Sequence, residues 1–156
     1  MCTSEKVASQ GVWMKARSPR AIEGGDEGLS IVVPVYNEEG RIRETAGALL
    51  RGLPRDAEIV FACNGCTDRS LEILTDVAGH RARILNLALP NKAAAIRAAE
   101  QHVDRFPRFY VDSDVVIEGS GIAALAVRIR TDDLEMISPR VEPDLRHASR
   151  AAKAVH

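Results

Sequence analysis

The sequence predicts an α/β protein with a mostly parallel sheet and helices on both faces. Short apolar runs rich in β-branched residues alternate with longer segments whose apolar residues recur at helical spacing. Polar turns follow successive apolar runs, as expected where right-handed crossovers join parallel strands. In such sheets ligands bind beyond the carboxyl ends of the strands, so these turns are where a site is expected.

The first strand and helix are predicted from residues 29–53. Residues 29–36 form a β-branched run typical of a buried parallel strand. Pro34 fits a central strand only near its end, past the last amide donor that the sheet needs. Apolar residues then recur at helical spacing from Ile42 to Leu53, and Gly52 and Pro54 end the helix.

The pattern then repeats. Strands are expected at residues 57–63 and 83–88, and Thr67 or Asp68 is placed to cap a helix that Gly79 ends. The elements expected in the rest of the chain are a helix at 92–102, a short strand at 109–111, a helix at 120–130, a fifth strand at 134–138 and a helix that is cut short at 147–156.

The N-terminal segment differs from the rest. Residues 1–28 are polar, show no period, and contain four basic and four acidic residues. We expect a flexible leader there, with Trp13 mobile or docked on the domain, and a single domain at residues 29–156.

Composition narrows the function classes. A net charge of −1 and an aromatic content of 4% give no reason to expect nucleic-acid binding. No run approaches the roughly 20 apolar residues of a transmembrane helix, and the N-terminus lacks the apolar core of a secretory signal. Three cysteines make no disulfide framework, so we expect a cytoplasmic protein.

Asp112-Ser113-Asp114 is the most informative motif. It follows the apolar run 109–111, and an extended backbone sends alternate side chains to one face, so Asp112 and Asp114 aim at one point. Mg²⁺ and Mn²⁺ prefer such oxygen ligands and keep open positions for phosphate oxygens. The motif therefore predicts a divalent cation site, although an isolated triplet of this kind is usually a solvated turn.

Four segments in register carry a resemblance to a known family. They are 31–39 (IVVPVYNEE), 60–68 (VFACNGCTD), 91–95 (NKAAA) and 110–114 (YVDSD). In order and approximate spacing they resemble a family 2 glycosyltransferase of the GT-A, Rossmann-like fold, over about residues 29–140. The resemblance implies transfer of a sugar from a nucleotide-diphosphate donor to an acceptor that the sequence does not name. It also implies Mg²⁺ or Mn²⁺ as the cofactor.

The resemblance also implies roles for residues of the donor site. Pro34 and Tyr36 would line the nucleotide pocket, although Tyr36 could simply pack at the strand end. Glu38 could accept a hydrogen bond from a ribose hydroxyl, or it could be an acid in the first turn of the helix that the helix dipole favours. These two roles are compatible.

The remaining roles concern the base, the phosphates and the metal. Asn64 would orient the base, or serve as a turn residue, and Lys92 would face phosphate or base, or be a solvated lysine. Asp112 would lie near the ribose and the metal, and Asp114 would be the main metal ligand. Asp68 fits a turn or cap role better than a contact to the base.

Two departures from the family pattern affect what is expected. Many relatives carry an acid that can accept from the base where this chain has Cys63, and a thiol is a poor substitute for it. Uracil is the default base that the resemblance implies, and guanine stays open. Only 42 residues follow Asp114, fewer than the family's domain normally has. We therefore expect a truncated, donor-binding half, with a partner chain as one way to supply the acceptor half. Glu135, Glu142 and Asp144 are the only nearby late acids that could serve as the general base.

Other functions remain as alternatives. The spacing of Cys63 and Cys66 suits a redox pair, but the strand pattern is not that of thioredoxin. No Gly-x-Gly-x-x-Gly follows the first strand, and the loop there is acidic, which disfavours a dinucleotide site or a nucleotidyltransferase. The strongest rival is a non-catalytic module that binds a nucleotide sugar or a partner.

Overall fold

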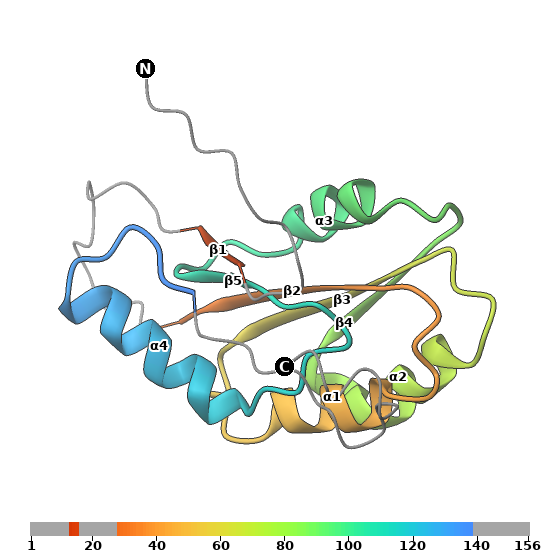
Figure 1. The fold of residues 1–156 in the computed structure, drawn as a ribbon, viewed down its shortest axis with the longest axis horizontal. Coiled ribbons are helices and arrows are strands. Elements are labelled where there is room, and N and C mark those ends of the chain that lie inside the picture. Colours follow the sequence, from red (N-terminus) through yellow and green to blue (C-terminus); the bar gives the residue numbers. More distant parts are fainter. Residues whose placement is uncertain (1–12, 16–27, 139–156) are drawn as a thin grey trace, which may run out of the picture.

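The computed structural model describes residues 13–15, by their backbone alone, and residues 28–138. Its five strands form one sheet in the order β1-β5-β2-β3-β4 (Figure 1). The strands are β1 (Trp13–Lys15), β2 (Ser30–Val35), β3 (Glu58–Asn64), β4 (Arg83–Leu87) and β5 (Arg108–Tyr110). Every neighbouring pair is parallel except β1 and β5. The predicted mostly parallel sheet is confirmed.

Helices cover both faces of this sheet, as the sequence predicts. In Figure 1, α3 lies on one face, and α1, α2 and α4 lie on the other. The helices are α1 (Ile42–Leu50), α2 (Ser70–Ala78), α3 (Lys92–Glu100) and α4 (Gly119–Thr131), with a short 3₁₀ helix, η1 (Gly79–Arg81), after α2. Strand β2 ends at Val35 and the parallel strand β3 ends at Asn64. The polar turns that follow these two strands therefore lie at the same edge of the sheet.

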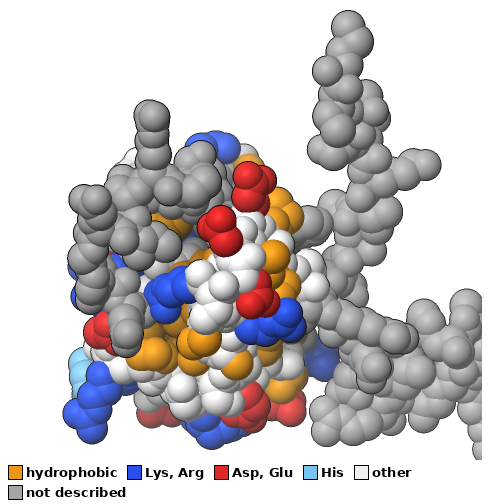
Figure 2. Space-filling view, turned by 90° about the vertical axis from the view of Figure 1, so that its left-hand side faces the viewer, with side chains coloured by type: hydrophobic (Ala, Val, Ile, Leu, Met, Phe, Trp, Pro, Cys, Tyr) orange, Lys and Arg blue, Asp and Glu red, His pale blue; other side chains and the backbone are white. Residues whose placement is uncertain are grey.

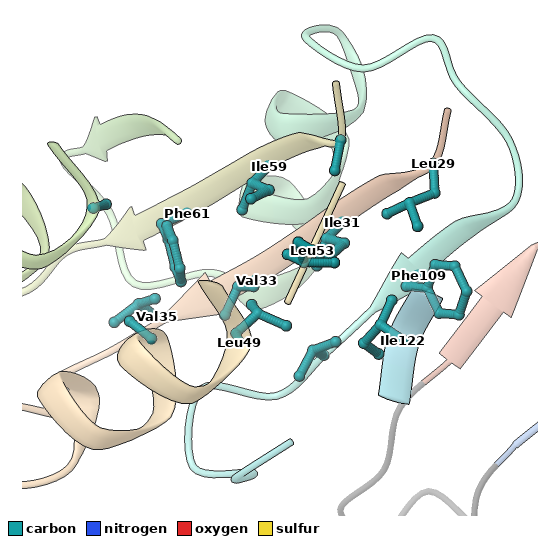
Figure 3. Close-up of a cluster of buried hydrophobic side chains, with 14 of the residues drawn as sticks. Leu29, Ile31, Val33, Val35, Leu49, Leu53, Ile59, Phe61, Phe109 and Ile122 are labelled. Atoms are coloured by element: carbon teal, nitrogen blue, oxygen red, sulfur yellow. The ribbon is translucent and has the colours of Figure 1, made fainter. Parts of the chain in front are cut away.

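Strand β2 lies at the centre and is buried along its whole length. Its alternation divides the core into two layers. Ile31, Val33 and Val35 pack toward α1, α2 and α4, together with Phe61 and other residues drawn in Figure 3. Val32 packs on the other face with apolar residues of α3. Each fully buried aliphatic side chain of this kind stabilises the fold by about 1.5–3 kcal/mol.

Pro34 is tolerated in this central strand because of where β5 stops. The carbonyl of Val32 accepts a hydrogen bond from the amide of Val111, so Val32 faces β5 with its backbone polar groups. Pro34, two residues further on, faces the same side. The register with β5 ends at Val32, so the amide that proline lacks lies beyond the last pairing.

The predicted fifth strand at residues 134–138 is wrong. No strand forms there, and the amide of Leu134 instead bonds to the carbonyl of Ile129 at the end of α4. The edge of β5 that faces away from β2 is already paired with β1. The place next to β5 is therefore taken, and Ile137 contributes only as a partly buried residue against the core.

Strand β1 lies inside the segment expected to be a flexible leader. Trp13–Lys15 pair antiparallel with β5, with Trp13 opposite Tyr110. For these three residues the expectation of a structureless leader is wrong. The rest of the segment up to residue 27 lies outside the described residues, as do Glu142, Asp144 and the helix expected at 147–156.

Candidate functional site

Polar turns follow β2, β3, β4 and β5 at one edge of the sheet. Because these strands are parallel, their carboxyl ends share that edge. In Figure 1 the β2–α1, β3–α2 and β4–α3 connections lie together at the right-hand end of the sheet. All seven of the site residues that the sequence predicts lie in β2, β3 or the residues that follow the four strands.

The turn after β3 is held against the turn after β4. Gly65 adopts a φ of 71°, and its amide donates to the carbonyl of Leu87 at 2.7 Å. A Cβ at position 65 would lie 2.8 Å from the backbone nitrogen of Pro90. Both the left-handed backbone and this close approach favour glycine, and they bring residues 64–68 against the segment that leads into α3.

The turn after β2 is tied to the start of α2 by two amide donors. Asn37, with a φ of 50°, accepts through Oδ1 from the amide of Thr67 at 2.8 Å. The amide of Glu38 donates to Oγ of Ser70 at 2.7 Å. Asparagine tolerates the left-handed region better than most residues, which suits it to this position.

A second, reciprocal pair of bonds joins the same two turns. The amide of Glu39 donates to Asp68 Oδ2 at 2.9 Å, and Glu39 Oε2 accepts from the amide of Arg69 at 3.1 Å. Asp68 Oδ1 also accepts from the amide of Ser70, the first residue of α2. Partial burial raises the pKa of Asp68, but the hydrogen bonds from Ser70 and Glu39 outweigh it and lower the pKa. Asp68 therefore fixes the loops, as a turn or cap residue would.

Lys92 and Asp112 form the closest charged pair at this edge. Lys92 begins α3 and Asp112 follows β5, and Nζ lies 2.5 Å from Oδ1. The Asp112 side chain is 16% exposed and the Lys92 side chain is 60% exposed. Lys92, predicted to contact phosphate or base, thus forms an ion pair with Asp112, predicted to bind the metal, although the two residues are 20 positions apart in the sequence.

Glu38 and Asp114 form an electrostatically unfavourable neighbour pair. Glu38 is half-buried, and its pKa is raised first by burial and then by the negative charge of Asp114. Asp68 adds to this rise, while the guanidinium of Arg41 opposes it. A carboxylate whose charge is disfavoured in this way would be stabilised by a cation placed between it and Asp114.

Asn64 and the two cysteines close the end of β3. Asn64 is buried, and its Nδ2 donates to the carbonyl of Val35 at 2.7 Å. Cys66 donates to the same carbonyl at 3.4 Å. Cys63 is fully buried, and burial, followed by the nearby Cys66, raises its pKa to about 12. A redox-active cysteine needs a lowered pKa, so the environment of Cys63 disfavours the redox alternative.

The two remaining predicted residues, Pro34 and Tyr36, lie at the end of β2. Pro34 is buried within β2, opposite Ala62 of β3, and Tyr36 is 50% exposed just after the strand. The structure therefore joins Lys92 to Asp112 and leaves Tyr36 half exposed to solvent.

The described residues offer oxygen donors for a metal but no complete set of ligands. Among residues 13–15 and 28–138, no group of three or more His, Cys, Asp and Glu side chains is arranged to hold an ion. Asp112 and Asp114 supply the hard carboxylate donors that Mg²⁺ and Mn²⁺ prefer. Magnesium is commonly bound through one or two carboxylates together with substrate phosphates and water, and these residues fit that mode.

With this geometry in place, comparisons with known proteins identify the class. The fold is the GT-A-like α/β fold. The crystal structure of S. aureus TarS 1–349 resembles it with a TM-score of 0.60 at 20% identity, covering 78% of this chain and 40% of that one. The chain belongs to glycosyl transferase family 2, because the model of that family, described as "Glycosyl transferase family 2", matches residues 30–147.

Curated relatives agree with this family. The chain is 29% identical over 127 residues to the glycosyltransferase AglD of Haloferax volcanii, covering 76% of this chain and 20% of that protein. It is 27% identical over 112 residues to the glycosyltransferase GlyG of Streptococcus pneumoniae, covering 70% and 37%. It is 46% identical over 56 residues to the uncharacterized glycosyltransferase EpsJ of Bacillus subtilis, covering 36% and 16%. The chain thus spans well under half the length of these relatives.

Sequence reasoning did not assign the residues that tie the loops together. Asn37, Glu39 and Ser70 hold the β2 and β3 turns in place through side chain–backbone hydrogen bonds. The signal in the sequence was limited to turn residues after the first two strands, Asn37 and Gly40 after β2 and Thr67 and Asp68 after β3, which predict local turns. It does not say that the partner of each side chain lies about 30 residues away.

Proposed function

We propose that this chain binds a nucleotide-diphosphate sugar together with Mg²⁺ or Mn²⁺ at the carboxyl edge of the sheet, for glycosyl transfer. One observation carries the proposal. The family's Asp112-Ser113-Asp114 segment lies where Lys92 contacts one carboxylate and Glu38 is close enough to the other to have its pKa raised. A lysine paired with one carboxylate, and a glutamate whose pKa is raised by another, at the ligand-binding edge of an α/β sheet are typical of a site for phosphates and a cation.

The chain's own residues take distinct roles in this proposal. Asp114 and Asp112 hold the cation, which when bound offsets the charge on the leaving diphosphate. Lys92 lies at the start of α3, next to Asp112, where its ammonium can meet a phosphate. Glu38 is placed to accept from a ribose hydroxyl, which would also satisfy a carboxylate that lacks a hydrogen bond within the described residues.

The nucleoside is proposed to lie against the β2 and β3 ends. Tyr36 offers its exposed ring to the base, and Pro34 lines the strand end beneath it. The Nδ2 group of Asn64 is already committed to the carbonyl of Val35, so Asn64 acts on the base through its remaining oxygen or by shaping the turn. Cys63 is buried among apolar residues and offers no acceptor in place of an acid, so this position does not select the base. A UDP-sugar, the default for the family, is proposed, and a GDP-sugar is the alternative.

The acceptor half of the reaction is proposed to depend on chain outside the described residues or on a partner chain. An inverting transfer needs a general base within hydrogen-bond reach of the acceptor hydroxyl. Glu135 is exposed beyond α4, and Glu142 and Asp144 lie outside the described residues. The acceptor stays unassigned, and a cytoplasmic location is part of the proposal. Among the described helices, none is long and apolar enough to cross a membrane.

A second candidate is a non-catalytic module that binds the donor. Donor binding and transfer separate the two candidates. A module binds UDP or GDP with the cation but leaves a UDP-sugar intact, whereas an enzyme hydrolyses or transfers it. Transfer requiring Glu135 would identify the base.

Calorimetry tests the binding site directly. We expect UDP or GDP to bind more tightly with Mn²⁺ than without it, and Asp114→Asn to weaken the Mn²⁺-dependent binding by more than about tenfold. The matched control is Asp76→Asn, which removes an exposed carboxylate of α2 that pairs with Arg43. Equal binding by the wild type and Asp114→Asn would overturn the proposed site.

A further inference from the structure

The Lys92–Asp112 ion pair has a consequence beyond holding a ligand. We propose that Lys92 acts as a built-in competitor of the divalent cation, because it occupies Asp112 when the cation is absent and moves to the diphosphate when cation and nucleotide bind together. The inference rests on the proposed function and concerns how the two ligands depend on each other. The carrying observation is the 2.5 Å contact between Lys92 Nζ and Asp112 Oδ1.

The local structure fixes the backbone of Lys92 and leaves its side chain able to move. Asn91 caps α3, since its Oδ1 accepts from the amide of Ala94 at 2.9 Å and its carbonyl accepts from the amide of Ala95. The Lys92 side chain is 60% exposed. A lysine is a compact charge on a flexible four-carbon stem, so the ammonium can change partner while the helix start stays in place.

The partner side chain is less free. Asp112 is 16% exposed and follows Val111, which is buried just after β5. A cation therefore has to reach the Asp112 carboxylate where it lies. A cation that binds without a nucleotide displaces the Lys92 ammonium from this carboxylate, and the ammonium is then left without an anionic partner. A cation that arrives with a diphosphate gives the displaced ammonium an anion to contact. Lys92 therefore favours joint binding over binding of the bare ion.

This arrangement predicts a positive coupling that is reciprocal. If the nucleotide tightens cation binding by some factor, the cation tightens nucleotide binding by the same factor. Removing the ammonium should improve binding of the ion alone, because Asp112 loses its competitor and the site loses a positive charge. The same change should weaken nucleotide binding in the presence of the ion. These opposite signs distinguish a competitor from a lysine that only contacts phosphate.

The experiment measures Mn²⁺ binding to the full chain by electron paramagnetic resonance, first with Mn²⁺ alone and then with saturating UDP. For Lys92→Met we expect Mn²⁺ alone to bind about 1.4- to fivefold more tightly than to the wild type, the range set by a partly exposed ion pair. We expect the tightening caused by UDP to become smaller. Arg97→Met is the matched control, since it removes one exposed positive charge from the same helix and should change neither quantity.

Two outcomes overturn the inference. Mn²⁺ affinity that is unchanged or weaker in Lys92→Met means that the ammonium does not compete for Asp112, and an equal change in Arg97→Met means that net charge alone is responsible. Lys92→Gln provides a second neutral variant, and thermal unfolding checks that each variant is folded. If wild-type chain binds neither Mn²⁺ nor UDP, the proposed function fails as well, whereas binding without the Lys92 effect overturns this inference alone.

Discussion

Two half-buried glutamates at opposite ends of the sheet have opposite electrostatic surroundings. Glu58 begins β3 at the amino edge, and Glu38 follows β2 at the carboxyl edge. Burial raises the pKa of Glu58, but hydrogen bonds from the amides of Arg105 and Asp104 and from the hydroxyl of Ser30 outweigh it and lower the pKa. The pKa of Glu38 is raised by burial and by Asp114.

The opposite pKa shifts of the two glutamates show that hydrogen bonds stabilise the charge at the amino edge of the sheet, whereas like charges oppose it at the carboxyl edge. Oε2 of Glu58 accepts three hydrogen bonds, from Ser30, Asp104 and Arg105, at 2.7–3.0 Å. Figure 2 looks at this end of the molecule, where acidic, basic and hydrophobic side chains are interspersed. At the carboxyl edge, by contrast, burial and the negative charges of Asp114 and Asp68 raise the pKa of Glu38. Such unrelieved charge is typical of a ligand site rather than of a structural one.

The largest effect is expected from breaking the amino-edge network. Glu58→Gln keeps the side chain's shape but removes the charge that strengthens three hydrogen bonds. We expect a loss of about 1–3 kcal/mol in the free energy of unfolding, measured by urea denaturation at pH 7. Glu72→Gln, at an exposed ion pair with Arg69, is the control and should leave the free energy of unfolding nearly unchanged. A loss at position 58 no larger than at 72 would contradict the comparison.

A smaller effect of opposite sign is expected at the carboxyl edge. Glu38→Gln removes a carboxylate whose charge is disfavoured by burial and by Asp114. We expect the free energy of unfolding at pH 7 to rise by about 0.2–1 kcal/mol. In the same variant, Mn²⁺-dependent UDP binding should weaken, because glutamine is a poorer acceptor for a ribose hydroxyl. Destabilisation together with unchanged binding would make Glu38 a structural residue like Glu58.

The fold could be predicted from sequence where periodicity and turns agreed. The strands that became β2, β3, β4 and β5 and the four helices were each predicted, with bounds that differ by a few residues. Residues 134–138 were predicted to form a strand but do not. Their apolar pattern is the same whether or not the sheet has a free edge for them to pair with. Three residues at 13–15, within a polar segment, took that edge. Competition between segments for one edge cannot be predicted from a local pattern.

The candidate site shows a similar division. Placing Asp112, Asp114 and Lys92 at one edge follows from strand order and motif spacing alone. Two contacts depend instead on how closely neighbouring turns approach one another. They are the ion pair between Lys92 and Asp112 and the hydrogen bond from Asn64 to the carbonyl of Val35. That approach is set by Gly65 against Pro90 and by hydrogen bonds between loops, which are tertiary features.

The finest test of the comparison is the pH dependence of the two variants. A glutamate whose folded pKa is lowered, such as Glu58, contributes stability above its ordinary value of 4.5 that is lost as pH falls through the folded pKa. A glutamate whose folded pKa is raised, such as Glu38, lowers stability as pH rises from 4.5 through the folded pKa. Urea unfolding at pH 7 and at about pH 3.5 should therefore show the Glu58→Gln loss shrinking on acidification, while the Glu38→Gln gain disappears. A gain from Glu38→Gln that persists at about pH 3.5, where the raised pKa of Glu38 leaves its carboxyl protonated, would mean that packing rather than charge distinguishes the two ends of the sheet.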